Sequence, residues 1–428
     1  MRNPRTSIWT ALCISMNKSF IHGILFSGFS FINRGIGFLL LLILANYLTP
    51  SEYGYLNLFN TVVMIVGYFM VMSAEGYVPI AYFGESKGSV NQVISCLLSL
   101  CLSVSSLFLL VVLLFGEELS KALSLPENCL YLVVIIGAFS ALINLKLDLY
   151  RIREKVINYG ILSCSNAILN FILSVLFIKY MLMGWQGRAY AYSFCCILFG
   201  CLCLWSIIRS YSLQKVDLRV LKMMLLYGLP LIPHLATNFI RQGCDRYIIN
   251  YWHGVDEVGL FSFALNLVNI ITMVGYGFNQ SNSISLYKVL GGNTSDKEKW
   301  VTIKSFIRRY LSIYAAIAII IVIVTYFVLG GLFPQYSSSM SYYLILSVYG
   351  LGVCEYLVYT NFLFFYKDTK KLMYVTFGSS VLHLILSLLF TRIDLHITAL
   401  IYAFTQIIVV LFIRHLALLK LKEKLNTN

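Results

Sequence analysis

The chain has 428 residues, of which 59% are hydrophobic and only 12% are charged, and its mean hydropathy is +0.81. A soluble enzyme or binding module of this length would not be so apolar. The net charge of +14 does not indicate nucleic-acid binding, because Lys and Arg gather in alternate connecting segments, as the positive-inside rule predicts. The 11 cysteines lie mostly within apolar runs without paired CxxC spacing, so we expect neither disulfides nor a metal site.

Apolar runs long enough to cross a bilayer recur along the whole chain and predict an all-α membrane protein with twelve transmembrane helices. The first run is too long for a signal peptide and no small-residue cleavage site follows it, so we expect a retained span. The expected spans are 19–47, 55–83, 92–115, 129–147, 156–180, 187–209, 223–252, 257–280, 308–330, 340–365, 371–391 and 396–415.

The orientation follows from the basic residues that flank these spans. On this reading 25 of the 32 Lys and Arg residues lie on one side and 4 on the other, while Arg34, Arg241 and Arg246 lie within spans. The richer side is cytoplasmic, so both termini are expected in the cytoplasm. The segment 287–304 is expected to be the longest cytoplasmic loop, and the loops on the other side are short.

Two stretches half a chain apart are similar. Residues 31–35 read FINRG and residues 239–243 read FIRQG, an offset of 208, and the turns that follow end in Glu-x-Gly at Gly54 and Gly259, an offset of 205. The first turn, Thr49-Pro50-Ser51-Glu52, predicts a capping box at a helix start. We therefore expect an N-terminal six-helix bundle (1–210), a basic cytoplasmic linker (211–222) and a C-terminal six-helix bundle (223–428). Six spans per half make the two bundles parallel, around a central cavity.

The first span carries an arginine near its middle. Arg34 has about 20 Å of helix on either side, which is too far for its side chain to reach the membrane surface. It must therefore contact protein or a water-filled cavity. A structural bridge to another helix is one interpretation, and a ligand-facing cation is the interpretation we favour.

The seventh span carries a polar face. Arg241 and Asp245 are spaced for an ion pair along one helix, and such a pair would only fix helix packing. In the other interpretation the polar face lines a cavity and binds a ligand. Pro230 and Pro233 interrupt the span, as in the broken helices of transporters. The face is formed by His234, Asn238, Arg241 and Asp245, with Gln242 and Arg246 beside it.

Two more acidic residues, Glu75 and Glu355, are predicted inside the membrane. Each either pairs with an arginine or takes up a coupling proton or sodium ion. His22 and His383 are expected to be packing or interfacial residues. Uncharged polar residues on spans five, eight and ten either line a wet interior or bond helices together. They are Ser163, Asn166, Asn170, Asn266, Asn269, Tyr276, Tyr356, Tyr359 and Thr360.

These residues carry a resemblance to a known family. Arg34-Gly35, the run 48–55 (LTPSEYGY), the run 227–233 (YGLPLIP) and Asp245-Arg246-Tyr247-Ile248-Ile249 resemble the polysaccharide-export branch of the multidrug/oligosaccharidyl-lipid/polysaccharide exporter superfamily. Within it, the repeat-unit flippases for O-antigen or capsule (the Wzx type) match best. The resemblance covers essentially the whole chain.

The resemblance implies a flippase of the bacterial inner membrane that moves undecaprenyl-pyrophosphate-linked oligosaccharide by alternating access, without a cofactor and without catalysis. Arginine suits pyrophosphate, because its planar guanidinium matches phosphate oxygens. Substrate contacts are expected from Arg34, Arg241, Arg246, Asn238 and Gln242, and ion coupling from Asp245, Glu75 or Glu355. The partners would be the lipid-linked sugar, membrane lipid, a proton or sodium ion, and possible association with a polysaccharide polymerase; nucleic acid is not expected.

Three alternatives remain open. A drug/cation antiporter of the same superfamily should have acids rather than arginines in its cavity. A lipid II flippase usually has two further spans. A membrane polymerase or ligase acting on the same lipid-linked sugars generally has a large outer loop with catalytic residues, and none is expected here.

Overall fold

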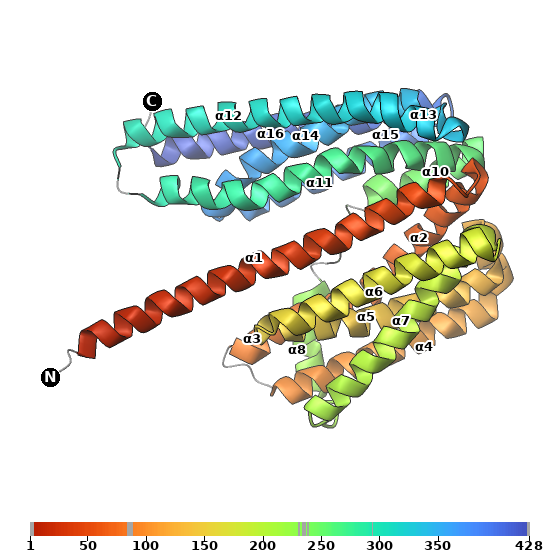
Figure 1. The fold of residues 1–428 in the computed structure, drawn as a ribbon, viewed down its shortest axis with the longest axis horizontal. Helices are drawn as coiled ribbons and strands as arrows, with labels where there is room; N and C mark the ends of the chain where they lie inside the picture. The colour runs from red at the N-terminus through yellow and green to blue at the C-terminus, as the bar shows by residue number, and fades with distance from the viewer. Residues whose placement is uncertain are drawn as a thin grey trace. The chain divides into compact units, whose positions relative to one another are not determined.

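The computed structural model describes residues 4–83, 89–229, 232, 237, 239–292 and 294–425 (Figure 1). Eleven helices within these residues are long and apolar enough to cross a membrane, which confirms the all-α membrane fold. The predicted seventh span, 223–252, is described only in part, so its crossing stays a prediction.

Helix contacts divide the chain into two compact units. Unit 1 contains Met1–Tyr47 and Val62–Ile232, and unit 2 contains Leu48–Thr61 and Pro233–Asn428. By this grouping of contacts, residues 48–61 belong with the second half of the chain and residues 218–228 with the first. The predicted bundle boundaries and the six-plus-six division of the spans stay predictions.

In unit 1, α5 packs against α4 and α7, and α1 packs against α6 (Figure 1). Helix α2 (Pro50–Met70) begins in unit 2 and ends in unit 1. The other helices of unit 1 are α1 (Pro4–Ala45), η1 (Ala74–Tyr77), α3 (Val78–Phe83), α4 (Val90–Leu123), α5 (Glu127–Ile152), α6 (Val156–Val175), η2 (Leu176–Tyr180), α7 (Gly184–Ser210) and α8 (Leu218–Gly228).

In unit 2, α14 packs against α11, α12 and α16, and α15 packs against α16. A buried core of leucine, isoleucine and aromatic residues joins α11, α12, α14, α15 and α16. The helices are η4 (Phe239–Gly243), α10 (Cys244–His253), α11 (Val255–Gly291), α12 (Asp296–Val324), η5 (Thr325–Leu329), α13 (Gly330–Leu332), η6 (Pro334–Tyr336), α14 (Ser339–Phe365), α15 (Thr369–Phe390) and α16 (Leu395–Lys424).

Capping boxes begin two of these helices. The backbone N–H of Thr49 donates to Glu52 Oε2 over 3.0 Å, and the N–H of Glu52 donates to Thr49 Oγ1 over 3.3 Å, which confirms the predicted cap of α2. Ser295 and Glu298 form the same box at α12. Because α11 continues to Gly291 and α12 begins at Asp296, most of the segment 287–304 is helical, and its place on the cytoplasmic side stays a prediction.

The predicted second span, 55–83, is broken. Helix α2 ends at Met70, because Met72 and Ser73 take left-handed backbone angles with φ of 50° and 56°. The chain resumes in η1 and α3. Gly228 at the end of α8 lies against this break: a methyl group on it would be 2.3 Å from the carbonyl oxygen of Met72. Glu75 thus lies in a short helix beside a break and not in a continuous span.

The two similar turns of the sequence meet within unit 2. A methyl group on Gly54 would lie 2.1 Å from the carbonyl oxygen of Val255, and one on Gly259 would lie 1.8 Å from that of Pro50. Val255 and Gly259 each follow Pro50 and Gly54 by 205 residues. The contact is therefore reciprocal, as two-fold-related segments make it, and supports the internal repeat.

Candidate functional site

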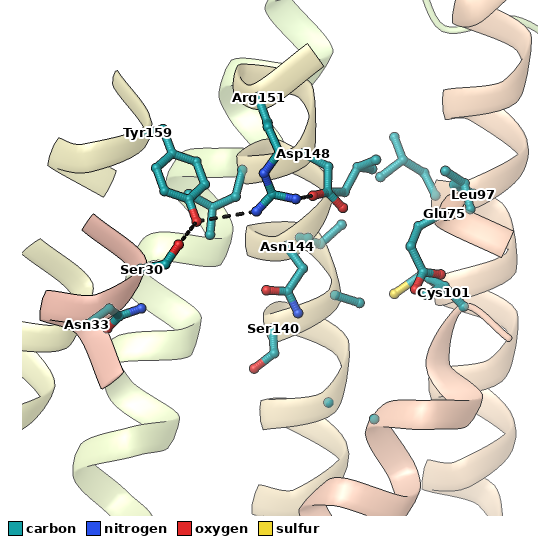
Figure 2. Close-up of a pocket in the computed structure, with 18 of the residues that line it drawn as sticks. Ser30, Asn33, Glu75, Leu97, Cys101, Ser140, Asn144, Asp148, Arg151 and Tyr159 are labelled. Carbon is teal, nitrogen blue, oxygen red and sulfur yellow. Dashed lines mark hydrogen bonds and ion pairs between the residues drawn. The ribbon is translucent and has the colours of Figure 1, made fainter. Parts of the chain in front are cut away.

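Unit 1 contains a polar cavity of about 490 Å³ (Figure 2). Its lining comes from α1, from the end of α2 and the break after it, and from α4, α5 and α6. The polar and charged residues that line it are Ser30, Asn33, Arg34, Glu75, Ser140, Asn144, Asp148, Arg151 and Tyr159.

A hydrogen-bonded chain crosses one side of this cavity. Arg151 Nη1 is 2.7 Å from Asp148 Oδ1, and Arg151 Nη2 donates to the Tyr159 hydroxyl over 3.3 Å. The hydroxyls of Tyr159 and Ser30 are 3.2 Å apart. Figure 2 shows these groups joined in a row from α5 through α6 to α1. Arg151 is therefore neutralised within its own site.

Arg34 and Glu75 lack such partners. Arg34 lines the cavity and makes no hydrogen bond or ion pair with another described residue. Glu75 Oε2 is buried and has no hydrogen-bond partner among the described residues. An unpaired guanidinium inside a membrane protein is costly unless water or a bound anion solvates it. Arg34 is thus available for an anionic ligand.

Unit 2 contains a second polar cavity, of about 380 Å³. It is lined by amides, hydroxyls and tyrosine rings, and Arg241 is the charged residue among the described residues that line it. The polar residues of its lining are Thr237, Arg241, Gln242, Asn269, Thr272, Tyr276, Tyr349, Tyr356, Thr376, Ser380 and Gln406. This composition suits a ligand with many hydroxyl groups and a negative charge.

Arg241 is held by neutral groups. Its Nη1 donates to Gln406 Oε1 over 2.8 Å and its Nη2 to Ser379 Oγ over 2.9 Å, while its buried Nε has no partner among the described residues. The ion pair to Asp245 that the spacing allows is not the contact that the structure shows. Arg241 keeps its full positive charge next to the cavity without a described carboxylate to compensate it.

The two cavities are lined at equivalent positions of the repeat. Asn33 and Arg34 of the first correspond, at the offset of 208, to Arg241 and Gln242 of the second. Gly67 and Val71 correspond, at the offset of 205, to Thr272 and Tyr276. A third set follows at an offset of 212: Gly137, Ala141 and Asn144 correspond to Tyr349, Val353 and Tyr356. Each cavity thus presents one arginine and one amide from the same helix turn.

Asp245 is buried next to the second cavity and not in it. Its Oδ2 is 2.7 Å from His383 Nε2, and both side chains are 1% exposed. The sequence predicts a packing or interfacial role for His383 and does not reveal this partner, because 138 residues separate the two and no local spacing links them. The sequence signal that points to such a partner is a lone histidine in an apolar span.

The remaining predicted residues lie elsewhere. Arg246 does not line the second cavity. Its Nη1 donates to Thr61 Oγ1 over 2.9 Å, and this bond joins α10 to α2. Glu355 on α14 is not in the cavity lining, and its electrostatic partner is Arg414 on α16. Asn238 and His234 lie outside the described residues.

Of the polar residues predicted on the fifth span, Asn170 bonds to a neighbouring helix. Asn170 Oδ1 accepts a hydrogen bond from Arg188 of α7, and Arg188 also donates to Ser174 Oγ over 3.2 Å. Asn266 of α11 likewise donates to the Tyr53 hydroxyl over 2.9 Å. In contrast, Asn269, Tyr276 and Tyr356 line the second cavity, so only part of the polar set belongs to the candidate site.

Residues 22–283 match the model of a family described as polysaccharide biosynthesis protein. The chain belongs to this family. Among curated proteins it is similar to the Lsg locus putative protein 1 of Haemophilus influenzae, with 21% identity over 84% of the chain and 88% of that protein. It is also 22% identical to a protein of the same organism described as an uncharacterized membrane protein, over 82% of the chain and 84% of the relative.

Two solved structures have a fold similar to that of this chain. The lipid II flippase MurJ in an inward closed conformation has a TM-score of 0.73 at 16% identity, covering 92% of this chain and 87% of that one. An inward-facing multidrug resistance MATE family transporter of the MOP superfamily has a TM-score of 0.71 at 14% identity, covering 90% and 94%. The fold is therefore that of the multidrug/oligosaccharidyl-lipid/polysaccharide exporter superfamily. The match to the polysaccharide biosynthesis family confirms the predicted polysaccharide-export branch.

Proposed function

We propose that the protein is a flippase that moves undecaprenyl-pyrophosphate-linked oligosaccharide repeat units from the cytoplasmic to the outer leaflet of the bacterial inner membrane. Family membership supports a role in polysaccharide biosynthesis, and the fold is shared with a lipid II flippase. Both termini would lie in the cytoplasm, and alternating access would expose the site to each side in turn. A functional association with a polysaccharide polymerase, which would use the product, is part of the proposal.

The observation that carries the proposal is the presence of Arg34 and Arg241 in the two equivalent cavities without described acidic partners. The pyrophosphate of a lipid-linked sugar is a compact polyanion, and guanidinium groups bind phosphate oxygens in a bidentate fashion. The tyrosines of the second cavity, such as Tyr276 and Tyr356, would stack on sugar rings, and Gln242 would bond to their hydroxyls.

Ion coupling would come from the buried acids. Glu75 is the candidate in unit 1, because its Oε2 has no described partner in the cavity that holds Arg34. Asp245 and Glu355 are the candidates in unit 2. Each would take up a proton or a sodium ion.

The test is complementation in a strain that lacks its own repeat-unit flippase, at matched membrane expression of every variant. Wild type should restore surface polysaccharide, whereas Arg34→Ala and Arg241→Ala should not, and lipid-linked repeat units should accumulate on the cytoplasmic side. Arg392→Ala removes an exposed cation outside both cavities and is the matched control. Full activity of both cavity variants would contradict the site.

Parallel assays in other strains separate the alternatives. A lipid II flippase would instead rescue cell-wall synthesis in a strain depleted of that activity, and a drug/cation antiporter would raise resistance to cationic dyes. A polymerase would change the chain length of the polysaccharide without changing the leaflet in which single repeat units accumulate. Any of these results in place of repeat-unit export would overturn the proposed substrate.

A further inference from the structure

The buried pair between Asp245 of α10 and His383 of α15 has a hydrogen-bonding pattern that defines its protonation. The two side chains approach to 2.7 Å and are almost completely excluded from solvent. The other ring nitrogen, His383 Nδ1, is 3.1 Å from Thr405 Oγ1 of α16. Three helices of unit 2 therefore meet at one imidazole.

Thr405 sets the tautomer of this imidazole. Its hydroxyl donates to the carbonyl oxygen of Ile401 over 2.8 Å, which uses its one hydrogen. With that hydrogen donated to Ile401, the Thr405 oxygen accepts from His383, and on this basis we assign the proton of the neutral ring to Nδ1. The ring nitrogen that faces Asp245 is consequently the one whose protonation can vary.

One proton is therefore required between Asp245 and His383. It is either on Asp245 Oδ2, which donates to a neutral ring, or on Nε2 of an imidazolium, which donates to a carboxylate. Without it, a carboxylate would face a nitrogen lone pair at 2.7 Å in a buried site, which is repulsive. With Nδ1 protonated, the described geometry is that of the proton-bound pair, and loss of the proton would weaken this contact between α10 and α15.

The pair is connected to the arginine of the second cavity. Arg241 Nη2 donates to Ser379 Oγ over 2.9 Å, and Ser379 Oγ lies 3.2 Å from the carbonyl oxygen of Thr405. The Tyr402 hydroxyl donates to the carbonyl oxygen of Arg241, and its ring packs edge-on against His383. Arg241 also lies in η4, a π-helical turn that leads directly into the helix bearing Asp245.

The charged and titratable groups around the pair come from three elements, α10, α16 and η4. Arg246 and Cys244 of α10 and Tyr402 of α16 interact electrostatically with Asp245. Arg241 completes the set through the bonds above. The positive charge of the two arginines favours the carboxylate, while the excluded environment favours a neutral pair, so the proton is held by a balance that a bound anion can shift.

We propose that Asp245 and His383 together bind a single proton, and that this pair is the ion-coupling site of the transporter. The inference rests on the proposed flippase function and names its coupling ion. A hard cation such as sodium prefers a set of oxygen ligands, whereas the group opposite Asp245 is a ring nitrogen. A polyanion bound at Arg241 adds negative charge nearby and strengthens proton binding, so substrate and proton are linked through Arg241.

The test uses the full-length protein purified in detergent, with undecaprenyl pyrophosphate as the probe. Binding is followed with radiolabelled probe, and proton exchange with a pH-indicator dye in weakly buffered solution. Wild type should take up as much as one proton per bound probe, and its affinity should fall by as much as about tenfold for each pH unit as the pH rises through the titration range. The range above about pH 8 is used because the pyrophosphate is fully ionised there.

Asp245→Asn is the decisive variant. Its carboxamide N–H can still donate to His383 Nε2, so the contact is kept while the exchangeable proton is lost. Binding should persist with no linked proton uptake and no pH dependence. His383→Gln, which removes the imidazole but keeps a polar partner for Asp245, provides a second comparison should Asp245→Asn not fold. The control is Asp394→Asn, which alters the exposed pair of Asp394 and His396, whose atoms are 2.9 Å apart.

The outcomes separate the two proposals. Equal proton uptake in wild type and in either folded variant overturns the proton-binding pair while leaving probe binding, and hence the flippase, intact. Probe affinity that depends on sodium and loses that dependence in Asp245→Asn overturns it in favour of a cation site. No binding of the probe to wild type refutes the proposed substrate itself. If neither variant folds, absence of proton uptake by wild type above pH 8 also overturns the proton-binding pair.

Discussion

At the scale of single residues, the three arginines within the predicted spans differ in what surrounds them. Arg34 reaches a cavity with no bonded partner among the described residues, Arg241 bonds to neutral groups beside a cavity, and Arg246 bonds to Thr61 between helices. The same residue type in the same membrane therefore serves two purposes. We propose that Arg34 and Arg241 bind the ligand, whereas the contact of Arg246 predicts a role in packing.

Arg34→Ala is expected to lower transport at limiting substrate by about tenfold to a hundredfold, because a charge-assisted contact to phosphate contributes about 1.5–3 kcal/mol. Arg34→Lys should retain part of the activity, since it keeps the charge but not the bidentate geometry. The measurement is the rate of repeat-unit export in the complemented strain. The melting temperature of the purified variants should match wild type, and a large drop would instead indicate a structural role.

Arg246→Ala should act in the opposite way. It removes the donor to Thr61 and leaves space between α10 and α2, at a cost of about 2–3 kcal/mol in the free energy of unfolding. We expect a lower melting temperature and a lower membrane yield. Both are measured by the fluorescence of a fused reporter, the first during heating. Transport per folded molecule should change little; selective loss of transport at normal stability would place Arg246 in the substrate site.

The sequence alone predicted that arginines lie inside the membrane, because their distance from the span ends can be counted. It could not assign their partners, which depend on contacts between helices far apart in the chain. Gln406 and Ser379 are more than 130 residues from Arg241. His383 was missed as the partner of Asp245 for the same reason.

At the scale of helices, the break after α2 is the main departure from the predicted spans. The residues at the break, Met72 and Ser73, include neither glycine nor proline, so hydropathy joins α2, η1 and α3 into one span. Helix lengths beyond the bilayer are also invisible to hydropathy, which explains why α11 and α12 were predicted too short. The caps of α2 and α12, in contrast, are local motifs, and the cap of α2 was predicted.

Gly228→Ala tests whether the break depends on close backbone packing. The added methyl group would lie 2.3 Å from the Met72 carbonyl oxygen and 2.8 Å from the Ala74 nitrogen, and backbone atoms cannot yield as a flexible side chain can. We expect a loss of about 2 kcal/mol or more, seen as a lower melting temperature. Gly37→Ala on α1, where the methyl group meets no atom within 4 Å, is the control. Equal melting temperatures would mean that the break is not held by this contact.

At the scale of the whole chain, the internal repeat organises both the fold and the candidate site. It was detected from two short stretches of sequence, and the reciprocal contact of Gly54 and Gly259 supports it. The correspondence of the two cavity linings was not predicted, because it requires knowing which face of each helix is turned inward. The offset of the third set, 212 residues, also differs from those of the first two.

Gly259→Ala should be among the most damaging substitutions that add a single carbon. Its methyl group would lie 1.8 Å from the Pro50 carbonyl oxygen, so α2 and α11 would have to move apart. Gly54→Ala should have a similar effect because its contact is the reciprocal one. The control, Gly277→Ala on the same helix, meets no atom within 4 Å and exchanges glycine for a better helix former. Membrane yield and melting temperature report the difference, and indistinguishable variants would contradict the tight crossing.

The exchanged order of arginine and amide in the two repeats has an evolutionary consequence. In a dimer of identical six-span chains both cavities would have to change together, because one gene would encode them. Fusion into one chain removes that restriction: Asn33-Arg34 and Arg241-Gln242 have diverged while each copy still carries a guanidinium. Under the proposed function, one cavity can acquire tyrosines for a new sugar while the arginine of each copy is retained for the pyrophosphate, so new surface polysaccharides would arise without loss of export.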